Sequence, residues 1–199
     1  MTLKKTAAYA IAICLIVSYC LFLAFGTSYV GGSEAYRVYY LEGKTEKYIP
    51  DERWQDLYCT DTEEYLDGSS ENLGTGWVSS DDGTRWTVGS DAYLYLYVED
   101  PDKDYRFQAT IWVDAGYHNR LIVNGTDVGD LYFAEDSDTA SVAIRKGLLV
   151  HGINTFCIHT DDEIRPFSEL HDWGTDSRGL NLHVASVLLS SGKESNSAY

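Results

Sequence analysis

The residues with the clearest chemical potential are tryptophans flanked by polar or charged side chains. Trp86 lies between Arg85 and Thr87, and Trp173 lies between an aspartate and a glycine. An indole face can stack on the apolar face of a sugar ring, while arginine and carboxylate groups bond its hydroxyls. Packing in a protein core explains Trp86 and Trp173 equally well, so both interpretations stay open. Trp112 lies inside an apolar run and is expected in the core.

A second polar feature is the pair Asp176 and Arg178, two positions apart in a segment that leads into an apolar run. An arginine and a carboxylate at this spacing can form a bidentate ion pair. Such a pair would hold the loop that presents Trp173. A ligand contact and a purely structural clamp are equally good readings of it.

The acidic residues do not form a recognisable metal motif. Asp100, Asp102 and Asp104 have the spacing of the first ligands of an EF-hand loop, but Tyr105 and Ile111 replace the required Gly and Glu. The segment is therefore interpreted as an acidic turn. The histidines show no zinc-binding spacing. No cofactor is predicted, although a structural calcium held by backbone carbonyls and one or two loop acids stays open.

Motifs of nucleophilic and nucleotide chemistry are missing from the sequence. It has no G-x-S-x-G elbow, no P-loop and no G-x-G-x-x-G. A carboxylate pair for glycoside hydrolysis is defined by separation in space, so sequence cannot identify it. The chain is predicted not to be an enzyme, and a hydrolase with unrecognised carboxylates is the alternative.

Composition narrows the class of protein further. The 199 residues carry 31 Asp and Glu against 15 Lys and Arg, a formal charge of −16. Phosphate backbones repel such a chain, which excludes nucleic-acid binding by a basic surface. Because 44% of the residues are hydrophobic and 14% are aromatic, the chain is expected to fold rather than to stay disordered.

The elements that must position these residues begin after an apolar N-terminal segment. Residues 6–25 carry no charge and follow Lys4 and Lys5. This pattern predicts a transmembrane anchor over residues 1–26 with the C-terminal part outside the cytoplasm; a cleaved signal peptide is the alternative. Without the two lysines the exported part has a charge of −16 − 2 = −18.

The cysteines divide at the same point. Cys14 and Cys20 lie in the apolar segment, whereas Cys59 and Cys157 are the two cysteines of the exported part. A lone pair in an oxidising compartment predicts a disulfide between Cys59 and Cys157. Two buried free thiols are the alternative.

Short apolar runs rich in β-branched and aromatic residues dominate the rest of the chain. They occupy residues 92–98, 105–113, 121–123, 140–144, 153–159 and 180–189. Turn signals separate them, and nothing between them is long enough for the helices of a parallel α/β fold. The sequence therefore predicts an all-β antiparallel jelly roll or β-sandwich over residues 71–190. Residues 27–70 are expected to form a stalk with a possible edge strand at 36–41, and residues 191–199 a disordered tail.

Asn124-Gly125 is the strongest hairpin signal. With Thr126 it also matches an N-glycosylation acceptor, so glycosylation of Asn124 is a further prediction.

The order of several signals resembles galactose-binding-like β-sandwich modules that accompany extracytoplasmic parts of envelope polysaccharide enzymes, such as membrane glycosyltransferases and phosphoglycerol transferases. The landmarks span residues 74–190. They are Gly76-Trp77, Gly83-Thr84-Arg85-Trp86-Thr87, Val123-Asn124-Gly125, Leu149 to Asn154, and Asp176 to Leu180. The resemblance implies a jelly-roll sandwich with an accessory, glycan-related role and no catalytic residues. A fused enzyme is missing, and the pair Cys59 and Cys157 is not part of the pattern.

These observations together predict a membrane-anchored, extracytoplasmic, non-catalytic module that binds a neutral glycan or envelope polysaccharide. A neutral ligand is favoured because the acidic surface repels anionic polymers. The expected ligand-binding residues are Arg85, Trp86, Trp173, Asp176 and Arg178. The alternative is a structural or interaction module that docks on a membrane glycosyltransferase or surface-layer partner without binding sugar.

Overall fold

A computed structural model describes residues 3–29, 32–80, 83–172 and 174–191 of the chain. Residues 192–199 of the predicted disordered tail and Trp173 lie outside the described residues, whereas Ser191 ends a strand. The chain divides into two compact units, Met1–Ser33 and Glu34–Tyr199.

The first unit consists of the helix α1, Leu3–Tyr29. Its large apolar side chains are exposed, among them Ile11, Leu15 and Phe22. Within the described part of the chain, however, no helix has both the length and the apolar character that crossing a bilayer requires. The membrane anchor predicted over residues 1–26 stays a prediction.

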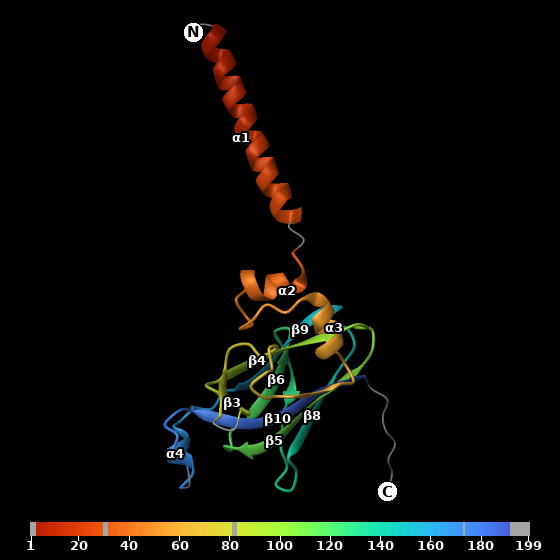
Figure 1. The fold of residues 1–199 in the computed structure, drawn as a ribbon, viewed down its shortest axis with the longest axis vertical. Helices are drawn as coiled ribbons and strands as arrows, with labels where there is room; N and C mark the ends of the chain where they lie inside the picture. The colour runs from red at the N-terminus through yellow and green to blue at the C-terminus, as the bar shows by residue number, and fades with distance from the viewer. Residues whose placement is uncertain (1–2, 30–31, 81–82, 173, 192–199) are drawn as a thin grey trace. The chain divides into compact units, whose positions relative to one another are not determined.

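The second unit is an antiparallel β-sandwich, as predicted, and Figure 1 shows its strands. One sheet has the order β2 Trp77–Ser79, β3 Arg85–Val88, β10 Leu180–Ser191, β5 Tyr105–Asp114 and β8 Thr139–Ile144, with β1 Glu63–Tyr65 also paired to β10. The other has the order β4 Asp91–Val98, β9 Gly152–Thr160, β6 Asn119–Val123 and β7 Thr126–Asp130. A short helix, α4 Phe167–Leu170, lies in the loop before β10.

The core lies between the two sheets and follows from the alternation of side chains along each strand. In β5 the buried residues are Tyr105, Phe107, Ala109 and Ile111, at every second position. Phe107 stacks on Phe156 of β9 with ring centroids 5.5 Å apart. Because each fully buried large apolar side chain contributes about 1.5–3 kcal/mol, this layer supplies the main stabilisation of the sandwich.

Residues 34–60 pack onto the outer face of the β4-β9-β6-β7 sheet instead of forming a stalk. They include α2 Glu34–Tyr36, a π-helical turn η1 Arg37–Leu41, and α3 Asp51–Leu57. Trp54 of α3 is buried against Tyr58 and Tyr95, with ring centroids 5.2 and 6.5 Å away. The strand predicted at 36–41 is wrong: Ala35 and Val38 are both buried, and their helical spacing turns one face toward the sheet.

Two tight backbone positions fix the connections. Gly76 has φ +89°, and a Cβ built there would lie 1.9 Å from the carbonyl oxygen of Asp91, so only glycine fits. The predicted hairpin at Asn124-Gly125 joins β6 to β7, with φ values of +50° and +81° at its two central residues. Positive φ at both positions is the requirement of a type I′ turn.

The predicted disulfide is wrong, because Cys59 and Cys157 are both free thiols. The backbone of Cys59 forms an isolated β-bridge with Tyr97 at one edge of β4. Cys157 in β9 pairs with Tyr93 at the other edge of β4. Four positions along a strand separate these partners by roughly 13 Å, beyond the reach of an S–S bond. Burial and the charge of Asp91 raise the pKa of the Cys157 thiol to about 12.

Candidate functional site

Three of the predicted ligand-binding residues, Arg85, Asp176 and Arg178, form hydrogen bonds within the protein itself. The guanidinium of Arg85 donates from Nε to the carbonyl of Asp67 at 3.0 Å and from Nη1 to Ser79 Oγ at 2.8 Å. Arg178 Nε lies 3.0 Å from each carboxylate oxygen of Asp176, in the predicted bidentate pair. These contacts hold the backbone near Asp67 and the loop before β10 in place. A ligand contact at either arginine stays a prediction.

Trp86 is buried, with 8% of its surface exposed. Its indole stacks on the imidazole of His183 with ring centroids 4.5 Å apart and contacts the edge of Phe167 at 5.1 Å. Phe167 belongs to α4, whose loop is tied to Arg178 by a bond of 2.9 Å from Phe167 N to the Arg178 carbonyl. The structure thus brings Trp86 close to the Asp176–Arg178 loop, although the indole face itself is covered.

Trp112 corrects the expectation of a core tryptophan, because 66% of its surface is exposed. Since Phe107, Ala109 and Ile111 of β5 point inward, the period of two directs Trp112 to the outer face. The Trp112 ring lies 5.8 Å from that of His183, which continues to Trp86 as one aromatic row across β5, β10 and β3. Strict alternation along this strand was the sequence signal that could have identified it.

Two adjoining hollows lie at the loop end beside Trp112. The first, of about 590 Å³, is lined by Trp112, Asp114, Phe133 and the acidic segment 134–138. The second, of about 390 Å³, shares Asp114 and Phe133 and adds aromatic and polar groups, among them Tyr117, His118, Asp130 and Tyr132. Exposed rings beside carboxylates are what a hydroxyl-bearing ligand with an apolar face requires. We call these two hollows the loop-end site.

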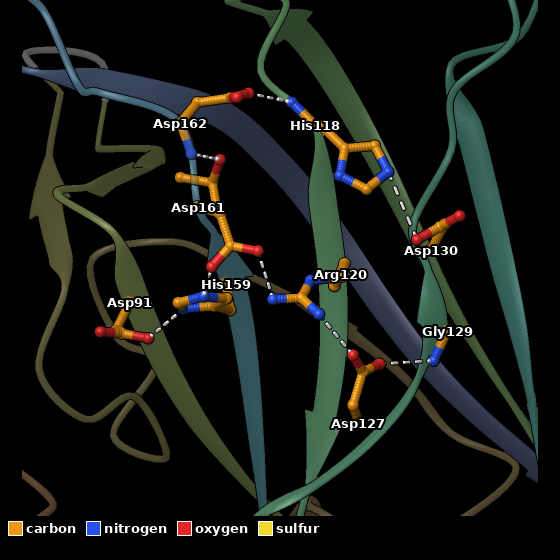
Figure 2. A network of polar contacts seen from close by, with 10 residues as sticks. Asp91, His118, Arg120, Asp127, Gly129, Asp130, His159, Asp161 and Asp162 are labelled. Carbon is orange, nitrogen blue, oxygen red and sulfur yellow. Dashed lines mark hydrogen bonds and ion pairs between the residues drawn. The ribbon is translucent and has the colours of Figure 1, made fainter.

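A polar network supports the four-stranded sheet behind the second hollow (Figure 2). Arg120 of β6 donates to Asp127 at 2.6 Å and to Asp161 at 2.5 Å. His159 of β9 places Nδ1 2.7 Å from Asp91 and Nε2 3.0 Å from Asp161. The network therefore links β4, β9, β6 and β7 across one end of the sheet's outer face.

The network continues to the wall of the second hollow. The backbone N–H of His118 donates to Asp162 at 2.7 Å, and the His118 ring lies 3.3 Å from Asp130 (Figure 2). Because His118 and Asp130 both line the hollow, these contacts fix the two loops that form it.

His159 makes stability depend on pH in a defined direction. Both ring nitrogens face carboxylates, which raises the pKa of His159 above its usual 6.5. The same bonds lower the pKa values of Asp91 and Asp161 below 3.8. The contribution of His159 to the free energy of unfolding is complete below pH 6.5, and it disappears as the pH rises through the raised pKa of His159. The contribution of Asp91 and Asp161 is complete above pH 3.8 and disappears as the pH falls through their lowered pKa values.

We therefore expect His159→Gln to flatten the decline in unfolding free energy on going from pH 6 to about pH 9. Urea denaturation at several pH values measures this. The control is His151→Gln, because the His151 ring contacts Tyr97 outside this network. An unchanged pH slope in His159→Gln would contradict the role of the imidazolium.

The side-chain amide of Asn124, the predicted glycosylation site, already forms hydrogen bonds at both its nitrogen and its oxygen. Asn124 Nδ2 donates to the Leu148 carbonyl at 3.0 Å and to Asn154 Oδ1 at 2.8 Å, and its Oδ1 accepts from Thr155 N. A glycan on Nδ2 would replace one of these donors. Glycosylation stays a prediction, and it would cost one of these bonds.

Over the part of the chain that the structure describes, no group of three or more His, Cys, Asp or Glu side chains is arranged to hold a metal ion. The lining of the loop-end site consists mainly of aromatic rings, carboxylates and hydroxyls. This set suits the reversible binding of a polar molecule.

No protein-family model and no curated protein matches the chain. Among the solved structures that resemble it are carbohydrate-binding modules. The CBM36-1 domain of a multidomain xylanase from the hindgut metagenome of Trinervitermes trinervoides is 15% identical, with a TM-score of 0.40, over 66% of this chain and 98% of that one. A CBM36 in complex with calcium and xylotriose is 14% identical, with a TM-score of 0.38, over 65% and 99%.

The CBM35 of Paenibacillus barcinonensis is 16% identical, with a TM-score of 0.38, over 66% of this chain and 99% of that one. These three neighbours are CBM35 and CBM36 modules. The predicted association with envelope enzymes stays a prediction.

Proposed function

We propose that the β-sandwich is a non-catalytic carbohydrate-binding module that holds a neutral glycan in the loop-end site. The observation that carries this proposal is the exposed indole of Trp112 at the rim of the hollow of about 590 Å³. A sugar ring would stack on the indole, and its hydroxyls would donate to carboxylates of Asp114 and of the segment 134–138. Trp86 of β3 would support Trp112 through the ring of His183, which lies between them. Ligand contacts of Arg85, Asp176, Arg178 and Trp173 remain proposals, and Trp173 lies outside the described residues.

Charge favours a neutral ligand. The loop-end site is bordered by Asp114, Asp130, Glu135, Asp136 and Asp138, and the whole chain has a formal charge of −16. Anionic polysaccharides would be repelled by both the site and the surface.

A glycan array probed with the full chain tests the proposal. We expect binding to neutral oligosaccharides and little binding to their uronic-acid counterparts at low salt. Binding confined to anionic glycans, or to none, would contradict it.

A second candidate function is an interaction module that docks on a membrane protein of the cell envelope, such as a glycosyltransferase. Exposed tyrosines in residues 36–48 favour it, because Tyr40 contacts Tyr36, Tyr39 and Tyr48, and neighbouring Leu41 is 68% exposed. Such clusters mark interaction surfaces. Cross-linking in cells should capture a membrane partner that Tyr40→Ser with Leu41→Ser loses; capture unchanged by the substitutions would exclude this surface.

We also propose that the sandwich acts outside the cytoplasm, with the uncharged segment 6–25 directing the chain to the membrane. Cys59 provides the test, because its thiol is partly exposed while Cys157 is buried. With Cys14 and Cys20 replaced by Ser, a membrane-impermeant maleimide should label intact cells, and Cys59→Ser should abolish the labelling. Labelling only after lysis would contradict export.

A further inference from the structure

We propose that a second cavity, between residues 34–44 and the outer face of the β4-β9-β6-β7 sheet, binds one or two neutral sugar rings independently of the loop-end site. This cavity has a volume of about 690 Å³, within the usual size of small-molecule sites. We call it the sheet-face cavity. It deepens the proposed function, because it would make the module bivalent.

The floor of the sheet-face cavity is built by two adjacent strands. Tyr93 and Tyr95 come from β4, and Ile153 and Thr155 from β9, where Tyr95 pairs with Thr155. The turn at Asn124-Gly125 closes one side. Tyrosine rings beside an isoleucine provide an apolar surface on which a sugar ring can lie.

Three hydroxyl groups of the lining are free to bond a ligand. Within the described chain, the side-chain hydroxyls of Thr75, Tyr95 and Thr155 have no hydrogen-bond partner. Only 1% of the surface of Tyr95 is exposed, and its hydroxyl is not among the buried polar atoms that lack a partner, so the exposed remainder includes the hydroxyl at the cavity wall. A ligand that bonds this hydroxyl would take the place of solvent there. The pKa of Tyr95 is raised by burial and by the Glu42 carboxylate, so this hydroxyl stays a donor.

The charges of the lining are already paired with one another. Arg37 contacts Glu34 and lies 3.4 Å from Glu42, and Lys44 lies 2.9 Å from Glu42. Two cations and two anions leave no uncompensated charge to hold an ionic ligand. This balance, together with the free hydroxyls, selects an uncharged, hydroxyl-rich molecule.

Trp112 of the loop-end site and the floor of the sheet-face cavity lie on different sheets. Trp112 is on the outer face of β5, in the sheet of β3 and β10, whereas Tyr95 and Thr155 are on the outer face of β4 and β9. They share no lining residue. Substitutions in one site are therefore expected to leave the other intact.

Isothermal titration of the full chain with glucose, galactose, mannose, xylose and their β-linked disaccharides tests the inference. Trp112→Ala should retain one binding event. Adding Tyr95→Phe and Thr155→Val, which remove two hydroxyls with little change of shape, should weaken that event at least about tenfold. Tyr65→Phe, an exposed tyrosine on β1, is the matched control.

Each outcome separates this inference from the proposed function. Complete loss of binding in Trp112→Ala would overturn the second site and leave the first. Loss in Tyr95→Phe with Thr155→Val but not in Trp112→Ala would support the sheet-face cavity and contradict the loop-end site. Unchanged binding in the hydroxyl variants, or stronger binding of glucuronate than of glucose, would overturn the inference.

Discussion

Replacing Trp112 with alanine is expected to weaken binding of a neutral oligosaccharide at the loop-end site about tenfold to a hundredfold. Stacking and burial of an indole against a sugar ring contribute about 1.5–3 kcal/mol, and each 1.4 kcal/mol corresponds to about a factor of ten. The measurement is titration of the full chain with the strongest oligosaccharide from the array.

The fold should tolerate this change. Because 66% of the Trp112 surface is exposed, the alanine leaves no cavity in the core, and substitutions of this kind usually change stability by about 0.5 kcal/mol or less. Tyr65→Ala is the matched control, since Tyr65 is 67% exposed on β1, where it pairs with Ser186 of β10, and it lines neither hollow of the loop-end site. Equal affinities of the wild type and Trp112→Ala for the oligosaccharide would show that the indole is not part of the binding site.

The position of Trp112 also shows where sequence reasoning succeeded and where it failed. Short apolar runs separated by turn signals predicted the antiparallel sandwich, and Asn124-Gly125 predicted the β6–β7 hairpin, because both signals are local. Trp112 was misassigned because an apolar neighbourhood was given more weight than the period of two. In a strand with Phe107, Ala109 and Ile111 inward, even a tryptophan faces outward.

Other features depend on contacts far apart in the chain. The sheet-face cavity joins Thr155 to residues 34–44, and no local pattern shows that this segment folds onto β4 and β9. The prediction of a Cys59–Cys157 disulfide followed from the count of cysteines alone, but the positions of Tyr97 and Tyr93 along β4 keep the two thiols apart. No local pattern shows that His183 and Phe167, far along the chain from Trp86, cover its indole.

Asn154→Ala is expected to lower the free energy of unfolding by about 3 kcal/mol. Asn154 is fully buried in β9 and bonds both groups of its amide. Its Oδ1 accepts from Val150 N and from Asn124 Nδ2, both at 2.8 Å. Its Nδ2 donates to the carbonyls of Val150 and Gly152 at 2.8 and 2.9 Å. Alanine would leave several buried groups without partners, at about 1 kcal/mol each.

Asn72 offers the matched comparison, because it is equally buried but makes fewer bonds. Its Nδ2 donates to the Tyr95 carbonyl at 3.2 Å, and its Oδ1 is buried without a partner among the described residues. Removing an unsatisfied acceptor offsets the loss of one bond, so Asn72→Ala should cost about 1 kcal/mol or less. Urea denaturation of the two variants measures the difference. A loss for Asn72→Ala equal to that for Asn154→Ala would show that burial of the side chain, rather than its hydrogen bonds, sets the stability of this end of the sandwich.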